Sequence, residues 1–190
     1  MRLPAASYRL MPWKNGQGMT REIAREPAPE GEAGGDFLWR LSIAEVAASG
    51  DFSLFAGCER WIALIEGAGM RLDFAEAPSR RIDRRFEPFA FSGDWHCRCS
   101  LLAGPVRDFN LIADRARVQA GCETLGLGGS PVERRVESGW LLVYCAQGRL
   151  RAGGFEAEAG DTVRLGAGRH GIEGRGAVAL AVSLHMRRGR

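Results

Sequence analysis

Short apolar or alternating runs that end at Gly, Pro or Asp recur along the whole chain, whereas helical periodicity is scarce. Residues 37–43 are typical, because large apolar side chains occupy the odd positions while Arg40 and Ser42 lie on the opposite face of the expected strand. Regular strand and turn spacing of this kind is the pattern of β-sandwiches and β-barrels. The sequence therefore predicts an all-β fold with little helix.

A faint internal repeat predicts how the strands are organised. In the first copy, residues 61–74 form two expected strands around a glycine and lead to Gly93-Asp94. In the second copy, residues 140–152 repeat this order and lead to Gly160-Asp161. Duplicated units of this kind indicate two fused barrels, and the order of strands and glycine turns resembles that of cupins. We therefore expect a bicupin, with two packed cupin barrels of the double-stranded β-helix or jelly-roll type.

The boundary between the two barrels is expected where glycines cluster. We assign residues 1–115 to an N-terminal cupin barrel and residues 116–190 to a C-terminal cupin-like barrel, with the link inside residues 114–130. Glycine-rich stretches between periodic segments commonly form loops.

The composition narrows the class of protein. A net charge of +3 over 190 residues is not the footprint of a nucleic-acid-binding domain. No stretch approaches the ~20 apolar residues that span a membrane, and residues 1–10 lack the apolar segment of a signal peptide. The five cysteines are scattered and odd in number, which favours reduced thiols. We expect a cytoplasmic protein without a membrane partner.

One polar, turn-forming segment stands out near the N-terminus. Lys14 is the only lysine among 26 Lys and Arg residues, and it lies in Pro12-Trp13-Lys14-Asn15-Gly16-Gln17-Gly18-Met19-Thr20. An ordered loop here would present an ammonium, the Asn15 amide and the Thr20 hydroxyl to a small anionic or polar ligand, with Trp13 as an apolar anchor. The alternative is a hairpin turn with a solvated lysine.

Several segments together resemble the HutD/Ves family of bicupins in the RmlC-like cupin superfamily. They are residues 12–23, Trp39-Arg40-Leu41-Ser42-Ile43-Ala44, residues 50–57, Glu59-Arg60, Phe91-Ser92-Gly93-Asp94 and residues 104–111. Their order and spacing cover most of residues 10–112, whereas the second half is similar only in its fold pattern. Two positions depart from the family: Glu59 stands where an Asp is frequent, and Trp61 follows the arginine.

The resemblance implies a small-molecule-binding protein more than an enzyme. Some members are encoded with histidine-utilisation enzymes, which implies binding or regulation by an intermediate such as urocanate, formylglutamate or formate; others are associated with cold or stress response. We expect a metal-independent, regulatory binding protein with no catalytic residue. The alternatives are a metal-independent cupin enzyme, with Asp94 or His96 as general acid or base, and a stress-related interaction protein.

The candidate site combines cations with neutral hydrogen-bonding groups. If Arg40 and Ser42 face the barrel interior, Arg40 needs a carboxylate, either from Asp94 or Asp108 or from a ligand. We expect the loop of residues 13–20 to lie over the mouth of the first barrel, so that Lys14 meets Arg40 and Arg60. The expected ligand-binding set is Trp13, Lys14, Asn15, Thr20, Arg40, Ser42, Arg60 and Asp94.

The neighbouring Asp108-Phe109-Asn110 has two interpretations. Phe109 is predicted to be core, while Asp108 and Asn110 point the other way and either cap a turn or reach the pocket. We favour the turn, because Asx side chains commonly bond nearby backbone.

Metal and macromolecular partners are not expected. The three histidines His96, His170 and His185 are widely spaced, and Cys97-Arg98-Cys99 has no second Cys or His pair nearby. We therefore predict no metal and no cofactor. The basic residues 80–85, within an insertion at residues 76–88, are interleaved with aromatics and could hold nucleic acid, but we favour a solvated insertion. Cupins often pair through edge strands, which leaves a homodimer open.

Overall fold

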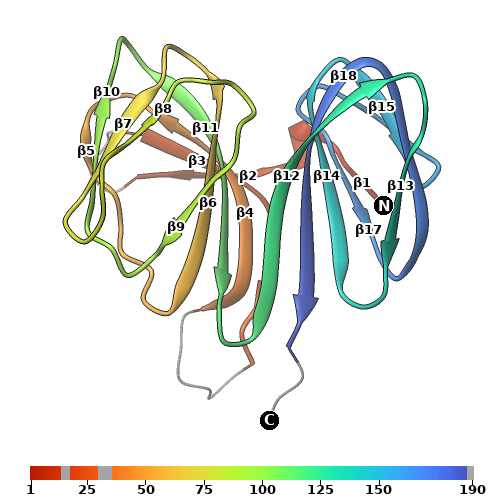
Figure 1. The fold of residues 1–190 in the computed structure, drawn as a ribbon, viewed down its shortest axis with the longest axis horizontal. Coiled ribbons are helices and arrows are strands. Elements are labelled where there is room, and N and C mark those ends of the chain that lie inside the picture. The colour runs from red at the N-terminus through yellow and green to blue at the C-terminus, as the bar shows by residue number, and fades with distance from the viewer. Residues whose placement is uncertain (14–17, 30–35, 188–190) are drawn as a thin grey trace. The chain divides into compact units, whose positions relative to one another are not determined.

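The computed structural model describes residues 1–13, 18–29 and 36–187, which are almost entirely β-strand apart from one 3-10 helix at Ala5–Ser7. The all-β prediction is confirmed. No helix among these residues has the length and apolar character needed to cross a membrane. The chain divides into two compact units, which we name the 9–116 unit and the 117–190 unit; the latter also contains residues 1–8 (Figure 1).

Two antiparallel sheets form the 9–116 unit. The larger sheet has the order β2 (Arg9–Pro12), β3 (Gly18–Pro27), β4 (Phe37–Val46), β11 (Val106–Asp114), β6 (Cys58–Glu66) and β9 (Phe89–Ser92). The smaller sheet has the order β5 (Gly50–Asp51), β10 (Cys97–Leu101), β7 (Met70–Phe74) and β8 (Arg80–Ile82). The strand β8 lies in the predicted insertion and pairs with β7, so the insertion extends the smaller sheet.

The two sheets of this unit share one hydrophobic core. Ile62 and Leu64 of the larger sheet pack in a cluster with Met70, Leu72 and Cys99 of the smaller sheet, and all five are almost fully buried. Apolar area removed from water stabilises such a core by roughly 25 cal/mol per Å². This core fixes the position of one face of β4, β11 and β6, on which the candidate site is built.

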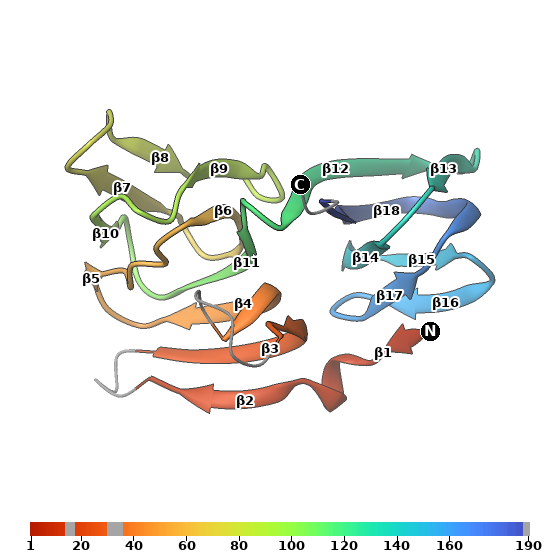
Figure 2. The ribbon, with the colours of Figure 1, turned by 90° about the horizontal axis from the view of Figure 1, so that it is seen from below.

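The 117–190 unit is also built from antiparallel strands. They are β1 (Arg2–Leu3), β12 (Val118–Gly128), β13 (Val132–Val136), β14 (Trp140–Gln147), β15 (Arg149–Ala152), β16 (Phe155–Glu158), β17 (Thr162–Leu165) and β18 (Gly168–Met186). The long strand β18 pairs with β13 and β15 through its first part and with β12 and β14 through its second part. Figure 2 shows β12 and β18 running beside each other. Apolar side chains from both parts form the core of this unit.

The glycine-rich stretch that was expected to form a link is strand β12. Gly121, Gly126 and Gly128 lie within this strand, where Leu125 and Leu127 are buried in the core of the unit. Pairing with β18 along most of its length overrides the local preference of glycine for loops. The contact-defined units also group residues 1–8 with residues 117–190. The division into two cupin barrels at residues 115 and 116 stays a prediction.

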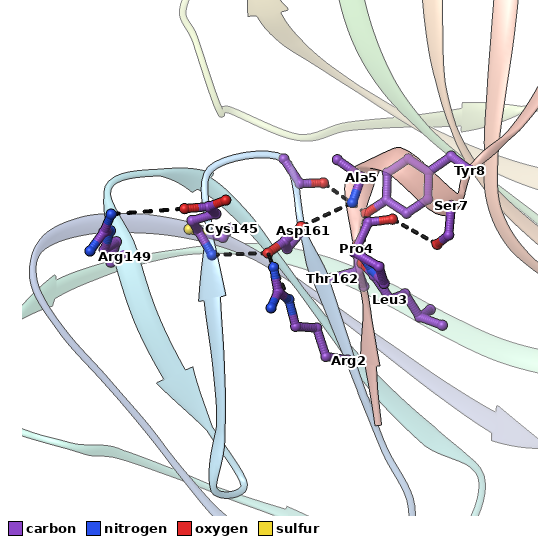
Figure 3. A network of polar contacts seen from close by, with 12 residues as sticks. Arg2, Leu3, Pro4, Ala5, Ser7, Tyr8, Cys145, Arg149, Asp161 and Thr162 are labelled. Atoms are coloured by element: carbon purple, nitrogen blue, oxygen red, sulfur yellow. Dashed lines mark hydrogen bonds and ion pairs between the residues drawn. The ribbon is translucent and has the colours of Figure 1, made fainter.

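A buried carboxylate holds the N-terminal residues within the 117–190 unit (Figure 3). Asp161 accepts hydrogen bonds from the backbone N–H of Ala5 at 2.9 Å and from Nε of Arg2 at 2.9 Å. The Tyr8 hydroxyl lies 2.9 Å from the Thr162 hydroxyl and donates to the Gly160 carbonyl oxygen at 2.7 Å. The Gly-Asp turn of the second sequence repeat is therefore structural.

Candidate functional site

A cavity of about 460 Å³ lies within the 9–116 unit. Its floor is formed by one face of β4, β11 and β6, and residues 11–13, residues 51–53 and Phe55 also line it. The polar lining residues are Thr20, Arg40, Ser42, Asp51, Ser53, Arg60, Asp108 and Asn110; the apolar ones include Trp13, Phe52, Phe55 and Ile112. Aromatic walls with a few converging polar groups are typical of small-molecule sites.

Strand register arranges the floor in rows. In the first row, Arg40 of β4 and Arg60 of β6 both pair with Ile112 of β11, so the two arginines flank one apolar residue. Ser42 pairs with Asn110 in the next row, two residues further along the strands. Asp108 pairs with Ala44 in the third row. The floor therefore runs from a cationic row through a neutral polar row to an acidic one.

Arg60 is enclosed by aromatic rings. Its guanidinium carbon lies 4.9 Å from the ring centroid of Phe91 and 5.2 Å from that of Phe55, and Nη1 donates to the carbonyl oxygen of Ser53 at 3.2 Å. Its Nε is buried and has no hydrogen-bond partner among the described residues. Burial lowers the pKa of Arg60 to about 10, whereas the nearby Asp108 acts to raise it. Arg60 is thus a buried cation with an unused donor.

Arg40 is half-buried beside Arg60. Its guanidinium carbon lies 5.2 Å from the Phe37 ring centroid and 5.3 Å from that of Phe55. Among the residues that the structure describes, no ion pair joins Arg40 to Asp94 or Asp108, and its buried Nε has no hydrogen-bond partner. Burial lowers the pKa of Arg40, while the charge of Glu22 acts in the opposite direction. Two cations, each with an unpartnered Nε, therefore lie on one row of the cavity floor.

Asp108 and Asn110 are part of the cavity, so the favoured turn interpretation of these residues is wrong. Both lie in the middle of β11 with Phe109 fully buried between them. Nδ2 of Asn110 donates to Oδ1 of Asp108, whereas Oδ2 of Asp108 is buried without a partner among the described residues. Burial raises the pKa of Asp108 to about 7, against the lowering effects of the Asn110 hydrogen bond and the Arg60 charge.

The N-terminal motif contributes three described residues to the cavity, which are Pro12, Trp13 and Thr20. Trp13 donates from Nε1 to the Thr20 hydroxyl at 2.9 Å, and both residues line the cavity. A Cβ at Gly18 would meet the carbonyl oxygen of Glu45 at 2.5 Å and the Trp13 ring at 2.9 Å, so glycine permits the close approach of the indole. Lys14 and Asn15 lie outside the described residues, and their predicted role stays a prediction.

The structure does not bring Asp94 to the cavity. Asp94 is exposed, accepts a hydrogen bond from the Gly57 N–H at 2.8 Å and forms an ion pair with Arg115 at 2.7 Å. It occupies the position of Asp161 in the sequence repeat, and both carboxylates fix nearby backbone. His96 is likewise exposed and contacts Glu76 at 2.9 Å, so neither it nor Asp94 is placed to serve the cavity as an acid or base.

The other positions singled out in the sequence lie elsewhere. Trp61 is half-buried on β6 and, like Glu59, is not among the residues that line the cavity. In the basic insertion, Arg81 pairs with Asp83 at 2.5 Å and Arg80 with Glu87 at 3.6 Å. These contacts agree with a solvated, charge-balanced insertion.

The histidines of the described chain do not match a cupin metal centre. His170 contacts the Gly166 carbonyl oxygen at 2.8 Å, and His185 contacts that of Ser138 at 2.9 Å. Nowhere in residues 1–13, 18–29 and 36–187 do three His, Cys, Asp or Glu side chains gather in a way that could hold a metal ion. Metal independence stays a prediction that elemental analysis can test.

Solved structures share this architecture. A cupin 2 conserved barrel domain protein from Leptotrichia buccalis superposes with a TM-score of 0.57 at 10% sequence identity, covering 93% of this chain and 92% of that one. At this identity the likeness concerns the fold alone, which is cupin-like.

Sequence comparisons identify the family. The HutD family model matches residues 5–181. This chain is 49% identical to the uncharacterized 21.2 kDa protein in the hutC 3′ region of Pseudomonas putida over 118 residues, which are 62% of this chain. It is 41% identical to protein Ves of Citrobacter koseri over 109 residues, which are 57% of this chain. These matches span only 60% and 54% of the two relatives. The structure of HutD from Pseudomonas fluorescens SBW25, solved under a formate condition, has a TM-score of 0.84 at 34% identity over 99% of both chains. This chain belongs to the HutD family.

Proposed function

We propose that this protein binds a small carboxylate in the cavity of its 9–116 unit and acts as a regulatory binding protein. The observation that carries the proposal is the pair of arginines on one row of the cavity floor, Arg40 and Arg60, each with a buried Nε that lacks a hydrogen-bond partner among the described residues. Buried donors without partners cost free energy. A carboxylate entering the cavity would satisfy both and neutralise the local positive charge.

Family context narrows the candidate ligands. One relative is described as a protein in the hutC 3′ region, and the structure of another was solved under a formate condition. Intermediates of histidine utilisation that carry a carboxylate, such as urocanate, formylglutamate or formate, are therefore the ligands to test. The cavity volume of about 460 Å³ leaves room for the larger two.

A metal-independent enzyme is the second candidate, and one observation favours it. Asp108 lines the cavity, and burial raises its pKa to about 7, which suits a general acid or base at neutral pH. Turnover of a carboxylate substrate that is lost in Asp108→Asn, with binding retained, would select this alternative over a binding protein.

Removal of one arginine tests the binding proposal. Arg40→Ala should weaken the binding of urocanate or formylglutamate by about 1–3 kcal/mol, because a charged hydrogen bond is lost. The fold should persist, since Arg40 forms no ion pair among the described residues. Isothermal titration calorimetry on the wild-type and variant proteins measures the effect.

The matched control is Arg149→Ala in the 117–190 unit. The Arg149 side chain is 86% exposed and forms a long ion pair of 3.9 Å with Glu158, so its removal should leave the affinity unchanged. Equal affinities of the wild-type protein and the Arg40→Ala variant would contradict the assignment of the cationic row to a ligand carboxylate.

A further inference from the structure

Asp108 has an unused hydrogen-bonding oxygen in the same cavity. Its residue is 1% exposed, Oδ1 accepts from Asn110, and Oδ2 has no partner among the described residues. A buried carboxylate oxygen that lacks a donor is costly and rare in folded proteins. The oxygen therefore suits a donor that enters the cavity with a ligand.

Asp108 is separated from the cations that would bind a carboxylate. Asp108 pairs with Ala44 and Ile112 pairs with Arg40, so four residues of β11 separate the acidic row from the cationic row. At 3.3 Å per residue this is about 13 Å between the backbone positions. No ion pair within 4 Å joins Asp108 to Arg40 or Arg60 in the described part of the chain. The cavity floor thus carries opposite charges on different rows.

The middle of the cavity floor is polar but uncharged. Ser42 and Asn110 occupy the row between the charged rows. Phe52 and Phe55 also line the cavity and add apolar surface to it, with the Arg60 guanidinium against both rings.

We propose that Asp108 determines specificity: the ligand carries an N–H or O–H donor that Oδ2 of Asp108 accepts, in addition to the carboxylate bound by Arg40 and Arg60. This inference rests on the proposed function and narrows it from any small carboxylate to molecules with a carboxylate at one end and a donor at the other. Simple acids such as formate would occupy only the cationic end.

A matched pair of planar acids tests the inference. trans-Urocanate has a ring N–H and a carboxylate, whereas trans-cinnamate has the same acrylate and a phenyl ring without a donor. Titration calorimetry at about pH 8 should show that the wild-type protein prefers urocanate by at least about tenfold, the effect of a hydrogen bond to a charged acceptor. In Asp108→Leu the preference should disappear while the affinity for cinnamate is retained.

Two further variants keep the test decisive. Asp108→Asn retains the size of the side chain and a neutral acceptor, so its preference should be intermediate, and it decides the matter if Asp108→Leu does not fold. Asp73→Asn changes a carboxylate that lies outside the cavity lining and pairs with Arg71, and the preference should be unchanged.

The outcomes separate the two proposals. Equal binding of both acids to the wild-type protein, or a preference that is undiminished in the Asp108 variants, would overturn the role of Asp108 while leaving carboxylate binding intact. Failure of urocanate, cinnamate and formylglutamate to bind the wild-type protein would overturn the proposed function together with this inference.

Discussion

Arg60 and Asp108 carry opposite charges into one buried cavity without a direct ion pair between them. Burial disfavours the charged form of each group, and it shifts the pKa of Arg60 down to about 10 and that of Asp108 up to about 7. A pair kept for structure alone would be expected to make contact, because uncompensated buried charge is strongly destabilising. The separation of the two groups therefore supports the proposal that a ligand completes the site.

Replacement of Asp108 by Asn should stabilise the protein in a pH-dependent way. The folded protein retains the Asp108 proton up to about pH 7, whereas the unfolded chain releases it near the ordinary value of 3.8, so wild-type stability falls as the pH rises between these values. Asn cannot ionise. The stability of Asp108→Asn relative to wild type should therefore increase by about 4 kcal/mol between pH 4 and pH 8. Urea unfolding at both pH values measures it, and a difference that does not change with pH would refute the assignment.

At the scale of elements, period-2 alternation predicted β4 well. The large odd-numbered side chains Trp39, Leu41 and Ile43 are almost fully buried, and Arg40 and Ser42 lie on the cavity face as expected. The prediction succeeds because successive side chains of a strand point to opposite faces of the sheet, whichever strands it pairs with.

Local rules failed where pairing partners decide the structure. Asp108 and Asn110 were assigned to a turn from side-chain preference, yet β11 is held between β4 and β6 along almost its whole length. Asp108 and Asn110 flank the apolar Phe109 in the sequence, and this period-2 pattern predicts a strand with both polar side chains on the face opposite to Phe109. Asp94 is expected in the site as a carboxylate partner for Arg40, yet it forms an ion pair with Arg115, and the repeat aligns it with Asp161, a structural carboxylate. The separation of Arg60 from Asp108 depends on strand register, which one sequence does not reveal.

The hairpin of β2 and β3 should tolerate no side chain at Gly18. In Gly18→Ala the new Cβ would lie 2.5 Å from the Glu45 carbonyl oxygen and 2.9 Å from the Trp13 ring, so either the backbone or the indole must move. We expect a loss of about 1–3 kcal/mol in the free energy of unfolding, as for other overpacked sites. Ligand affinity should fall as well, because Trp13 lines the cavity.

The control for this prediction is Gly126→Ala in β12. A Cβ at Gly126 meets nothing within 4 Å, so the free energy of unfolding should stay within about 0.5 kcal/mol of wild type. Urea unfolding of the two variants compares them directly. Equal stabilities would show that the indole and the β4 backbone accommodate the methyl group.

Considered over the whole molecule, the two units differ in how their interiors are filled. Apolar side chains such as Val143, Val163 and Ile172 form the core of the 117–190 unit. In the 9–116 unit the core shares its sheets with a polar cavity. The proposed binding function therefore concerns the 9–116 unit, and the cupin-like architecture of the fold does not by itself assign a function to the other unit.

Residues 1–8 depend on a carboxylate that lies far away in the sequence. Asp161, whose side chain is 4% exposed, binds Arg2 at 2.8 Å and accepts from the backbone N–H groups of Ala5 and Glu158. In Asp161→Asn the ion pair is lost and an amide replaces an acceptor oxygen, so we expect a loss of about 1.5–3 kcal/mol in stability. The Ala5 amide should exchange its hydrogen faster, as measured by hydrogen exchange with mass spectrometry.

Glu137→Gln, at a side chain that is 77% exposed, should leave both the stability and the exchange rate at Ala5 unchanged. Unaltered exchange at Ala5 in Asp161→Asn would mean that the pairing of β1 with β17 holds these residues without the carboxylate.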